Sequence, residues 1–229
     1  MDSIEIVKTK EGIDTLINTR INEHYHSLHG AMQESVHVFI RNGLLALNKN
    51  LPEIKILEMG FGTGLNAILT YRESYVLQKQ IHYTTIESSP LPMAIINKLN
   101  YFEYFGKALL PMFQRMHDCN WFENVTFGDF VLFKINADML EFKLDGSYDL
   151  VYYDAFSPTH QPELWSFEVL QKVYDSCNKG AMLVTYCANG EVKRTLKKVG
   201  VTVETLPGPK WKRVMIRACK LNLIKIVAH

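Results

Sequence analysis

The stretch Glu58-Met59-Gly60-Phe61-Gly62-Thr63-Gly64-Leu65-Asn66 decides the fold. An apolar run over 54–59 leads into the glycines and predicts a short buried strand, and residues 65–75 predict a helix after them. Glycine lets the backbone turn sharply and approach a ligand closely, and the amides that open the helix can bind a polar group. A strand, a glycine-rich loop and a helix in this order are typical of a nucleotide site in an α/β protein.

The spacing of the glycines and the acid before them narrow the choice of ligand. The pattern is G-x-G-x-G, which departs from the G-x-G-x-x-G of dinucleotide-binding proteins. Glu58 is poorly placed to lie beside two phosphates, whereas it can orient the loop or face the cationic amino group of S-adenosylmethionine. We therefore predict an S-adenosylmethionine site, with a purely structural glycine turn as the alternative. The predicted cofactor-binding residues of this stretch are Glu58, Gly60, Gly62, Gly64 and Asn66.

Outward from this unit, strands alternate with helices along the chain. Further strands are predicted over 81–86, 131–135, 148–153 and 181–186, and helices over 93–117, 162–177 and 191–199. Such alternation implies right-handed crossovers and a parallel sheet. Two last strands, over 201–204 and 214–218, are separated only by a turn and predict an antiparallel hairpin at one edge. This α/β layout resembles the seven-stranded, mostly parallel sheet of the class I (Rossmann-like) methyltransferases.

Length and composition predict one ample domain. The chain has 229 residues, of which 47% are hydrophobic and 21% charged, and these values exclude general disorder. No strong linker interrupts it. Residues 51–229 are predicted to form the S-adenosylmethionine-dependent methyltransferase domain, and residues 1–50 an N-terminal extension that packs on it. In the extension, a short strand near Ile4 is followed by a helical pattern.

Three acids follow predicted strands, at the edge where parallel sheets bind their ligands. Glu87 comes 23 residues after Gly64, an offset at which an acid accepts hydrogen bonds from both ribose hydroxyls. Asp138 is predicted to accept from the adenine amine, with a role as a helix cap or turn residue as the alternative. Asp154 falls where a methyl donor meets its acceptor.

The net charge of +1 hides an asymmetry. Residues 191–229 carry ten basic and two acidic side chains, or +8, whereas residues 1–190 carry 15 basic and 22 acidic ones, or −7. One interpretation is a lysine-rich solvated helix and tail. The other is a local binding surface for a polyanion.

The remaining composition indicates a cytoplasmic protein. No stretch approaches about 18 uninterrupted apolar residues, which excludes a membrane span, and the N-terminus lacks the pattern of a secretory signal. Cys119, Cys177, Cys187 and Cys219 form no C-x-x-C pair, so we expect reduced thiols. Four histidines between positions 24 and 37 complete no familiar ligand spacing, and we predict no metal site.

Motifs outside the glycine loop are more specific. They are Tyr25-His26-Ser27, Glu34-Ser35-x-x-Val38-Phe39-Ile40, Asp154-Ala155-Phe156-Ser157-Pro158, Pro162-Glu163-Leu164-Trp165 and Gly208-Pro209-Lys210-Trp211-Lys212-Arg213. In this combination, over most of residues 20–218, they resemble the tRNA 5-methylaminomethyl-2-thiouridine-forming methyltransferase domain. In bifunctional members of that family a flavin-dependent oxidase follows. No second glycine-rich fingerprint occurs before His229, so the resemblance implies a standalone methyltransferase without a flavin domain.

The resemblance implies methyl transfer from S-adenosylmethionine to the primary amine of 5-aminomethyl-(2-thio)uridine at the tRNA wobble position, with the anticodon stem-loop as partner. Asp154 would orient the amine or receive its proton, and Tyr25 and Glu34 join the cofactor site. Rings at Tyr25, Tyr153 and Phe156 can sandwich the flipped uracil, with ordinary core packing as the alternative for each ring. The implied substrate-binding residues are His26, Phe156, Pro158, Lys210, Lys212 and Arg213, the last three through phosphates.

Some features leave other functions open. Pro209 and Trp211 depart from the G-x-G-x-K-R pattern that the family usually shows before its basic triplet. Related sheets with acidic strand ends also serve aminopropyltransferases and small-amine methyltransferases, which are the leading alternative. A non-catalytic protein that binds RNA or an adenosyl ligand is the second alternative. The sequence predicts no particular oligomeric state.

Overall fold

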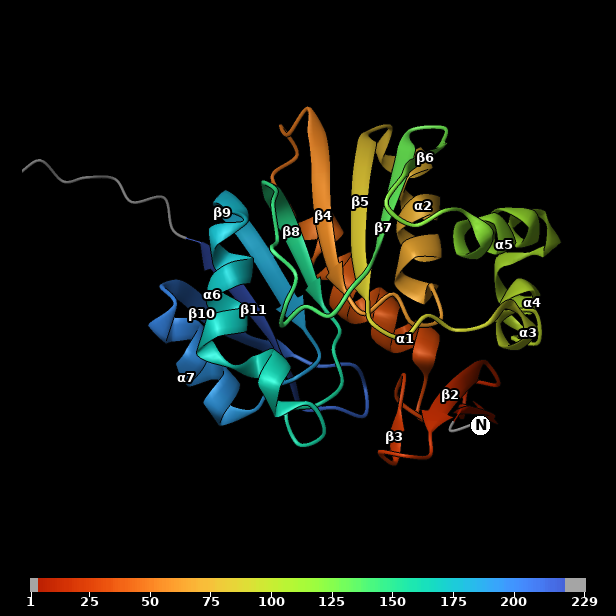
Figure 1. Cartoon of the computed structure of the whole chain (residues 1–229), viewed down its shortest axis with the longest axis horizontal. Helices are drawn as coiled ribbons and strands as arrows, with labels where there is room; N and C mark the ends of the chain where they lie inside the picture. The colour runs from red at the N-terminus through yellow and green to blue at the C-terminus, as the bar shows by residue number, and fades with distance from the viewer. Residues whose placement is uncertain (1–3, 221–229) are drawn as a thin grey trace, which may run out of the picture.

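The computed structural model describes residues 4–220, and its centre is an eight-stranded sheet with helices on both faces (Figure 1). The strands lie in the order β10-β11-β9-β8-β4-β5-β7-β6. The five central ones run parallel, while β11 is antiparallel to β9 and β10, and β6 is antiparallel to β7. Their bounds are β4 Glu53–Met59, β5 Gln80–Glu87, β6 Asn124–Phe127, β7 Phe130–Asn136, β8 Tyr148–Tyr153, β9 Cys177–Thr185, β10 Val201–Pro207 and β11 Val214–Lys220.

This architecture confirms the predicted fold class, a mostly parallel Rossmann-like sheet with an antiparallel C-terminal pair. The sequence predicted seven strands in this sheet, whereas the structure has eight among the described residues. The extra strand, β6, pairs with β7 across a tight turn at Gly128, whose φ of 61° favours glycine. β6 has only four residues, which are too few to show a clear alternation of apolar and polar side chains. The sequence analysis therefore did not predict this strand.

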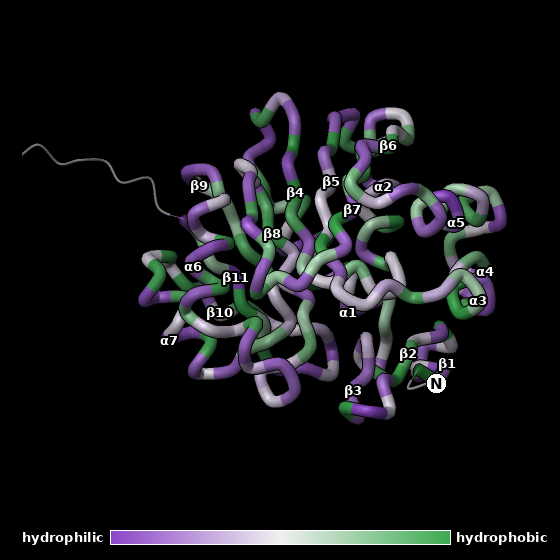
Figure 2. Tube along the Cα trace, viewed as in Figure 1, coloured by the Kyte–Doolittle hydropathy of each residue, from purple (hydrophilic) through white to green (hydrophobic). Residues whose placement is uncertain are grey.

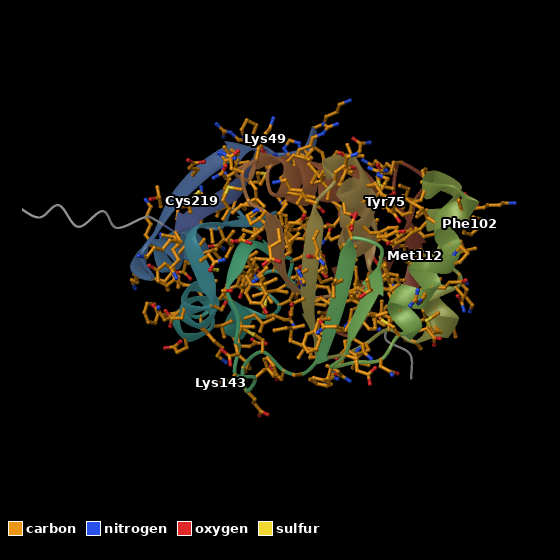
Figure 3. The ribbon with its side chains drawn as sticks, turned by 90° about the horizontal axis from the view of Figure 1, so that it is seen from above. Lys49, Tyr75, Phe102, Met112, Lys143 and Cys219 are labelled. Atoms are coloured by element: carbon orange, nitrogen blue, oxygen red, sulfur yellow. The ribbon has the colours of Figure 1, made fainter. Side chains whose placement is uncertain are left out.

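The two faces of the sheet form two separate apolar clusters. One lies against α2 (Leu65–Leu77) and η1 (Val36–Arg41), a π-helical segment. The other lies against α6 (Phe167–Asp175) and α7 (Gly190–Lys198). Consecutive residues of a strand point to opposite faces, so that in Ile56-Leu57 of β4 the first belongs to one cluster and the second to the other. Figure 2 shows hydrophobic residues along the central strands, and Figure 3 shows side chains filling both layers.

Two predicted helices are divided. Residues 93–117 form four short pieces, because the backbone changes direction between them and Gly106 (φ 84°) ends the second. They are α3 Met93–Ile96, α4 Tyr101–Phe105, η3 Lys107–Leu109 and α5 Leu110–Asp118. The predicted helix over 162–177 begins as the short turn η4 (Pro162–Trp165). It resumes as α6, where the Ser166 side chain accepts a hydrogen bond from the Val169 amide and caps the new start.

The N-terminal segment forms a small antiparallel sheet, whose first strand was expected near Ile4 and whose other two strands lie where a helical pattern was expected. This sheet consists of β1 Ile4–Lys8, β2 Asp14–Asn18 and β3 Glu23–His24. Helical structure starts only at α1 (Ala31–Ser35), continues into η1 and ends in a short turn, η2 (Leu44–Ala46). Asp14 and Asn100 exchange backbone-to-side-chain hydrogen bonds of 2.8 and 3.0 Å, and these tertiary contacts favour the strand over the local helical pattern.

The small sheet lies beyond the carboxyl ends of the central strands (Figure 1). This is the edge at which ligands bind in open α/β sheets. Within residues 4–220, no helix is both long and apolar enough to cross a membrane.

Candidate active site

A cavity of about 860 Å³ occupies this edge of the sheet. Its floor is the glycine loop and the ends of β4, β5, β7 and β8, and its walls come from the small N-terminal sheet and from the loop before β11. Eleven residues that were predicted from the sequence line it: Tyr25, His26, Glu34, Gly60, Gly62, Asn66, Glu87, Asp138, Asp154, Phe156 and Lys212. The cavity lining does not include the other predicted residues, Glu58, Gly64, Pro158, Lys210 and Arg213.

The glycine loop needs its glycines for two reasons. Gly60, Gly62 and Gly64 have φ of 90°, 48° and 72°, values that other residues rarely adopt. A Cβ at Gly64 would lie 2.6 Å from the His117 ring, and one at Gly62 would lie 3.2 Å from the Tyr25 ring. Gly64 therefore packs against the protein behind the loop, while Gly62 keeps the cavity open beside Tyr25.

Glu87 is held rigidly at the end of β5. One of its carboxylate oxygens accepts a hydrogen bond from the Gly62 amide (3.0 Å), and the other accepts one from the Ser89 amide (2.8 Å). Asp138, after β7, is exposed, and its side chain accepts from the Leu140 amide at 2.9 Å in a local turn. Asp138 therefore closes a turn and also lines the cavity, so the two roles proposed for it are compatible.

Asp154 lies directly after β8, and α2 reaches it. The Asn66 side-chain amide donates a hydrogen bond of 2.8 Å to its carboxylate. Burial, followed by the nearby carboxyls of Glu58 and Glu34, raises the pKa of Asp154 well above its usual range, while Asn66 and Lys212 oppose this shift. A carboxyl with a raised pKa is suited to take up a proton near neutral pH.

Glu58 is fully buried on the face of the sheet that α2 covers. Its carboxyl faces Tyr83, Thr85 and Asn66, and neither of its oxygens has a hydrogen-bond partner in good geometry. Burial raises the pKa of Glu58 to about 8. Strand alternation explains the placement, since Met59 turns toward the other face. As a mostly neutral acid that faces Asn66 from outside the cavity lining, Glu58 can donate a hydrogen bond to the Asn66 side chain and support it from behind.

Aromatic residues separate into those at the cavity and those in the core. Tyr25 and Phe156 meet edge to face with ring centroids 5.1 Å apart, and both line the cavity. Tyr153 is fully buried, packs on Trp165 at 4.8 Å and donates to a backbone carbonyl, so it is unavailable to stack on a base. The Trp165 ring nitrogen donates to the Phe156 carbonyl at 2.8 Å and anchors that loop.

His26 lies on the N-terminal wall. Its ring nitrogen is 2.9 Å from the Thr15 hydroxyl, and burial lowers the pKa of His26 to about 4. The imidazole is therefore neutral at pH 7 and can exchange hydrogen bonds with a ligand without repelling a cation.

Lys212 points inward, unlike its neighbours. Its ammonium lies 3.8 Å from a carboxylate oxygen of Glu34 and 4.4 Å from the centroid of the Tyr186 ring. The other Glu34 oxygen accepts from the Ser27 amide at 3.0 Å. Lys210 and Arg213, in the same loop, are exposed.

The basic C-terminal charge is partly used within the fold. Arg217 pairs with Glu204 at 2.7 Å, and the Lys220 ammonium donates to two backbone carbonyls. Lys225 lies outside the described residues. The cations left exposed are Lys210 and Arg213 of the loop before β11 and Arg194, Lys197 and Lys198 of α7, of which Arg194 pairs with Glu191.

Several lining residues were missed because their signals are not local. Glu23 accepts from the Ser157 amide at 3.0 Å and pairs with His160, which ties the small sheet to the loop after β8. This hydrogen bond joins residues 134 positions apart in the sequence, so no local sequence pattern predicts it. Tyr186 comes directly after β9, as Asp154 comes directly after β8. The expectation that ligands bind at the carboxyl ends of parallel strands could therefore have identified Tyr186 as well. Other lining residues that were missed include Arg20, Ile21, Leu28, Ser88 and Trp211. Within residues 4–220, no three potential metal-binding side chains gather as a metal site would require.

Comparison with known proteins identifies a related family. Residues 101–221 match a family described as S-adenosyl-L-methionine-dependent methyltransferase. A tRNA 5-methylaminomethyl-2-thiouridine biosynthesis bifunctional protein MnmC from Leptospira interrogans is 30% identical over 214 residues, which cover 88% of this chain and 33% of that protein. The chain spans about a third of the length of the curated relatives it matches.

Solved structures share the fold. The crystal structure of MnmC2 from Aquifex aeolicus has a TM-score of 0.74 at 22% identity and covers 97% of this chain and 71% of its own. Spermidine synthase from Thermotoga maritima has a TM-score of 0.57 at 15% identity and covers 95% and 69%.

Proposed function

Because the chain belongs to the S-adenosyl-L-methionine-dependent methyltransferases of the MnmC methyltransferase-domain family, we propose that it methylates the primary amine of 5-aminomethyl-(2-thio)uridine at the tRNA wobble position. The observation that carries this proposal is the position of Asp154, a cavity-lining acid that Asn66 holds at the strand end. The choice of acceptor is supported by the names of the relatives, which refer to the biosynthesis of 5-methylaminomethyl-2-thiouridine in tRNA.

The lining of the cavity supports S-adenosylmethionine as its ligand. Without a side chain at Gly62, the space beside Tyr25 stays free. The carboxylates of Glu87 and Asp138 lie at the ends of β5 and β7, where they would bind the ribose hydroxyls and the adenine amine. When bound, this cofactor supplies a methyl group on a cationic sulfonium. The acid-rich lining suits that charge.

The chain's own residues would prepare the acceptor amine. An alkyl amine is mostly protonated at pH 7 and must lose a proton before it can react. Asp154, with its raised pKa, would receive that proton directly or through water while Asn66 fixes its orientation. Tyr25 and Phe156 would contact the uracil and keep water away. Much of the remaining rate enhancement would come from holding the amine in line with the methyl group of the donor.

The exposed cations beside the cavity would bind the RNA backbone. Lys210 and Arg213 project from the loop before β11, and α7 offers more basic side chains. Because the Lys212 ammonium lies inside the cavity, we no longer assign it to a phosphate. We also propose a cytoplasmic location, which agrees with four free thiols among the described residues.

The proposal is tested with tRNA that carries 5-aminomethyl-2-thiouridine. The purified protein and S-adenosylmethionine should convert it to the methylaminomethyl form, as seen by nucleoside mass spectrometry. In cells that lack the protein, the unmethylated nucleoside should accumulate. Putrescine serves as the comparison acceptor. Turnover of the polyamine in place of the tRNA, or an unchanged nucleoside profile in the cells, would reject the proposed acceptor.

Glu87 provides a test of the cofactor site. Glu87→Ala should weaken S-adenosylmethionine binding about 10- to 100-fold, since it removes charged hydrogen bonds to the ribose. Titration calorimetry measures the affinity. Glu87→Gln keeps an acceptor for the Gly62 amide and separates loop support from ligand binding. Unaltered affinity in both variants would contradict the ribose role.

A further inference from the structure

The cavity is strongly acidic. Among the described residues that line it, six carry carboxyl groups: Glu23, Glu34, Glu87, Asp138, Asp154 and Glu163. Only Arg20 and Lys212 bring a permanent positive charge. S-adenosylmethionine carries an α-carboxylate beside its α-ammonium, and this negative group needs a partner in an otherwise repulsive site.

The glycine amides of the loop are not free to bind it. The Gly60 amide donates to the Ile86 carbonyl at 2.9 Å, and the Gly64 amide to the Phe61 carbonyl at 2.8 Å. The Gly62 amide donates to Glu87 at 3.0 Å. In many nucleotide sites such amides bind an anion. Here all three already have acceptors, so a side-chain cation is the stronger choice for the carboxylate.

Of the two cations, Lys212 is better placed. Arg20 is exposed at the turn after β2, where water screens its charge. The Lys212 side chain is 32% exposed, and its ammonium lies over the Tyr186 ring, which also lines the cavity. Interactions of a partly desolvated ammonium are stronger than those of an exposed one.

Lys212 also has a matching acid beside it. Glu34 Oε1 lies 3.8 Å from its ammonium, and the Ser27 amide fixes Glu34 Oε2. The α-ammonium and α-carboxylate of an amino acid are carried on a single carbon. An adjacent acid and base therefore complement this zwitterion, the acid binding the ammonium and the base the carboxylate.

We propose that Lys212 binds the α-carboxylate of S-adenosylmethionine and Glu34 its α-ammonium. Lys212 then determines cofactor choice, since decarboxylated S-adenosylmethionine, the aminopropyl donor, lacks the group that Lys212 recognises. This pair thereby separates a methyl-transferring site from an aminopropyl-transferring one on the same sheet. The inference rests on the cofactor class of the family and not on the tRNA acceptor.

Titration calorimetry without any tRNA tests this with three ligands: S-adenosylmethionine, its decarboxylated form and 5′-methylthioadenosine. Wild type should prefer the first over the second about 10- to 100-fold. Lys212→Met keeps the apolar stem and should lose that preference, while its affinity for the decarboxylated form stays within about twofold. Glu34→Gln should weaken both amine-bearing ligands but not methylthioadenosine. Lys179→Met, an exposed change away from the cavity, should leave all three affinities unchanged.

Two results would overturn the proposal. In one, Lys212→Met keeps the wild-type affinities for all three ligands, which would return Lys212 to a phosphate-binding role. In the other, the variant binds all three ligands more weakly by one common factor, which would indicate a structural role. Thermal unfolding identifies a misfolded variant, and Lys212→Arg, which restores the charge, should recover part of the preference. A tRNA that is not methylated would reject the acceptor and leave this result standing.

Discussion

Asp154→Asn is expected to lower the rate of methyl transfer about 10²- to 10⁴-fold, the range typical of a lost general base. Asparagine has the same shape and can still accept the hydrogen bond that Asn66 donates, so the loop after β8 should keep its structure. What it loses is the capacity to accept a proton from the amine. The expected defect is therefore in kcat, measured by single-turnover methylation of hypomodified tRNA at saturating cofactor.

The pH profile separates proton transfer from positioning. If Asp154 accepts the proton, the wild-type rate should rise with pH through the raised pKa of that carboxyl, and Asp154→Asn should lack that rise. Glu163→Gln is a matched control, since Glu163 also lines the cavity, is exposed and has no proposed role. It should retain both the rate and the profile. A variant at Asp154 that transfers methyl groups at the wild-type rate would exclude the catalytic role.

The predicted lining residues fall into two groups. Tyr25, His26, Glu34, Phe156 and Lys212 were implied by the resemblance, whereas the others lie in the glycine loop and the helix that follows it, or at and just beyond a strand end. Glu87, Asp138 and Asp154 line the cavity because parallel strands bring their carboxyl ends to one edge. The order of elements therefore predicts this part of the site. It does not predict what the side chains contact, so the ligand roles of these residues stay proposals.

The predictions about Glu58, Tyr153 and Lys212 differ from the structure for other physical reasons. Glu58 is one residue short of the strand end, and alternation turns it toward α2. Tyr153 ends β8 in the buried layer, so of the two roles considered for its ring, core packing is the one that the structure shows. Lys212 points inward because of its contacts with Glu34 and Tyr186, which are distant in sequence. In the sequence, Lys212 cannot be distinguished from the basic residues beside it. Tertiary contacts of this kind leave no periodic signal.

Glu58→Gln is expected to make the protein more stable at pH 8 by about 4 kcal/mol, while leaving it nearly unchanged at pH 4.5. Burial raises the pKa of Glu58 from 4.5 to about 8. Between these values the folded protein keeps a proton that the unfolded chain releases, so this group favours folding at low pH and loses that contribution as pH rises. Glutamine has almost the same volume and can donate a hydrogen bond to Asn66, but it does not titrate.

The measurement is the free energy of unfolding in urea at several pH values from 4.5 to 8, for wild type and variant. Other buried groups also titrate: burial lowers the pKa of both His26 and His117 to about 4, and these add stability as pH rises toward 6.5. They are present in both proteins, so the difference between the two curves isolates Glu58 and its coupling to Asp154. Glu163→Gln, an exposed change, should follow the wild-type curve. Parallel curves for Glu58→Gln and wild type would mean that Glu58 is ionised in the folded protein. Glu58 would then be a second carboxylate beside Asp154, and the support we assign to it behind Asn66 would have to come from a charged group.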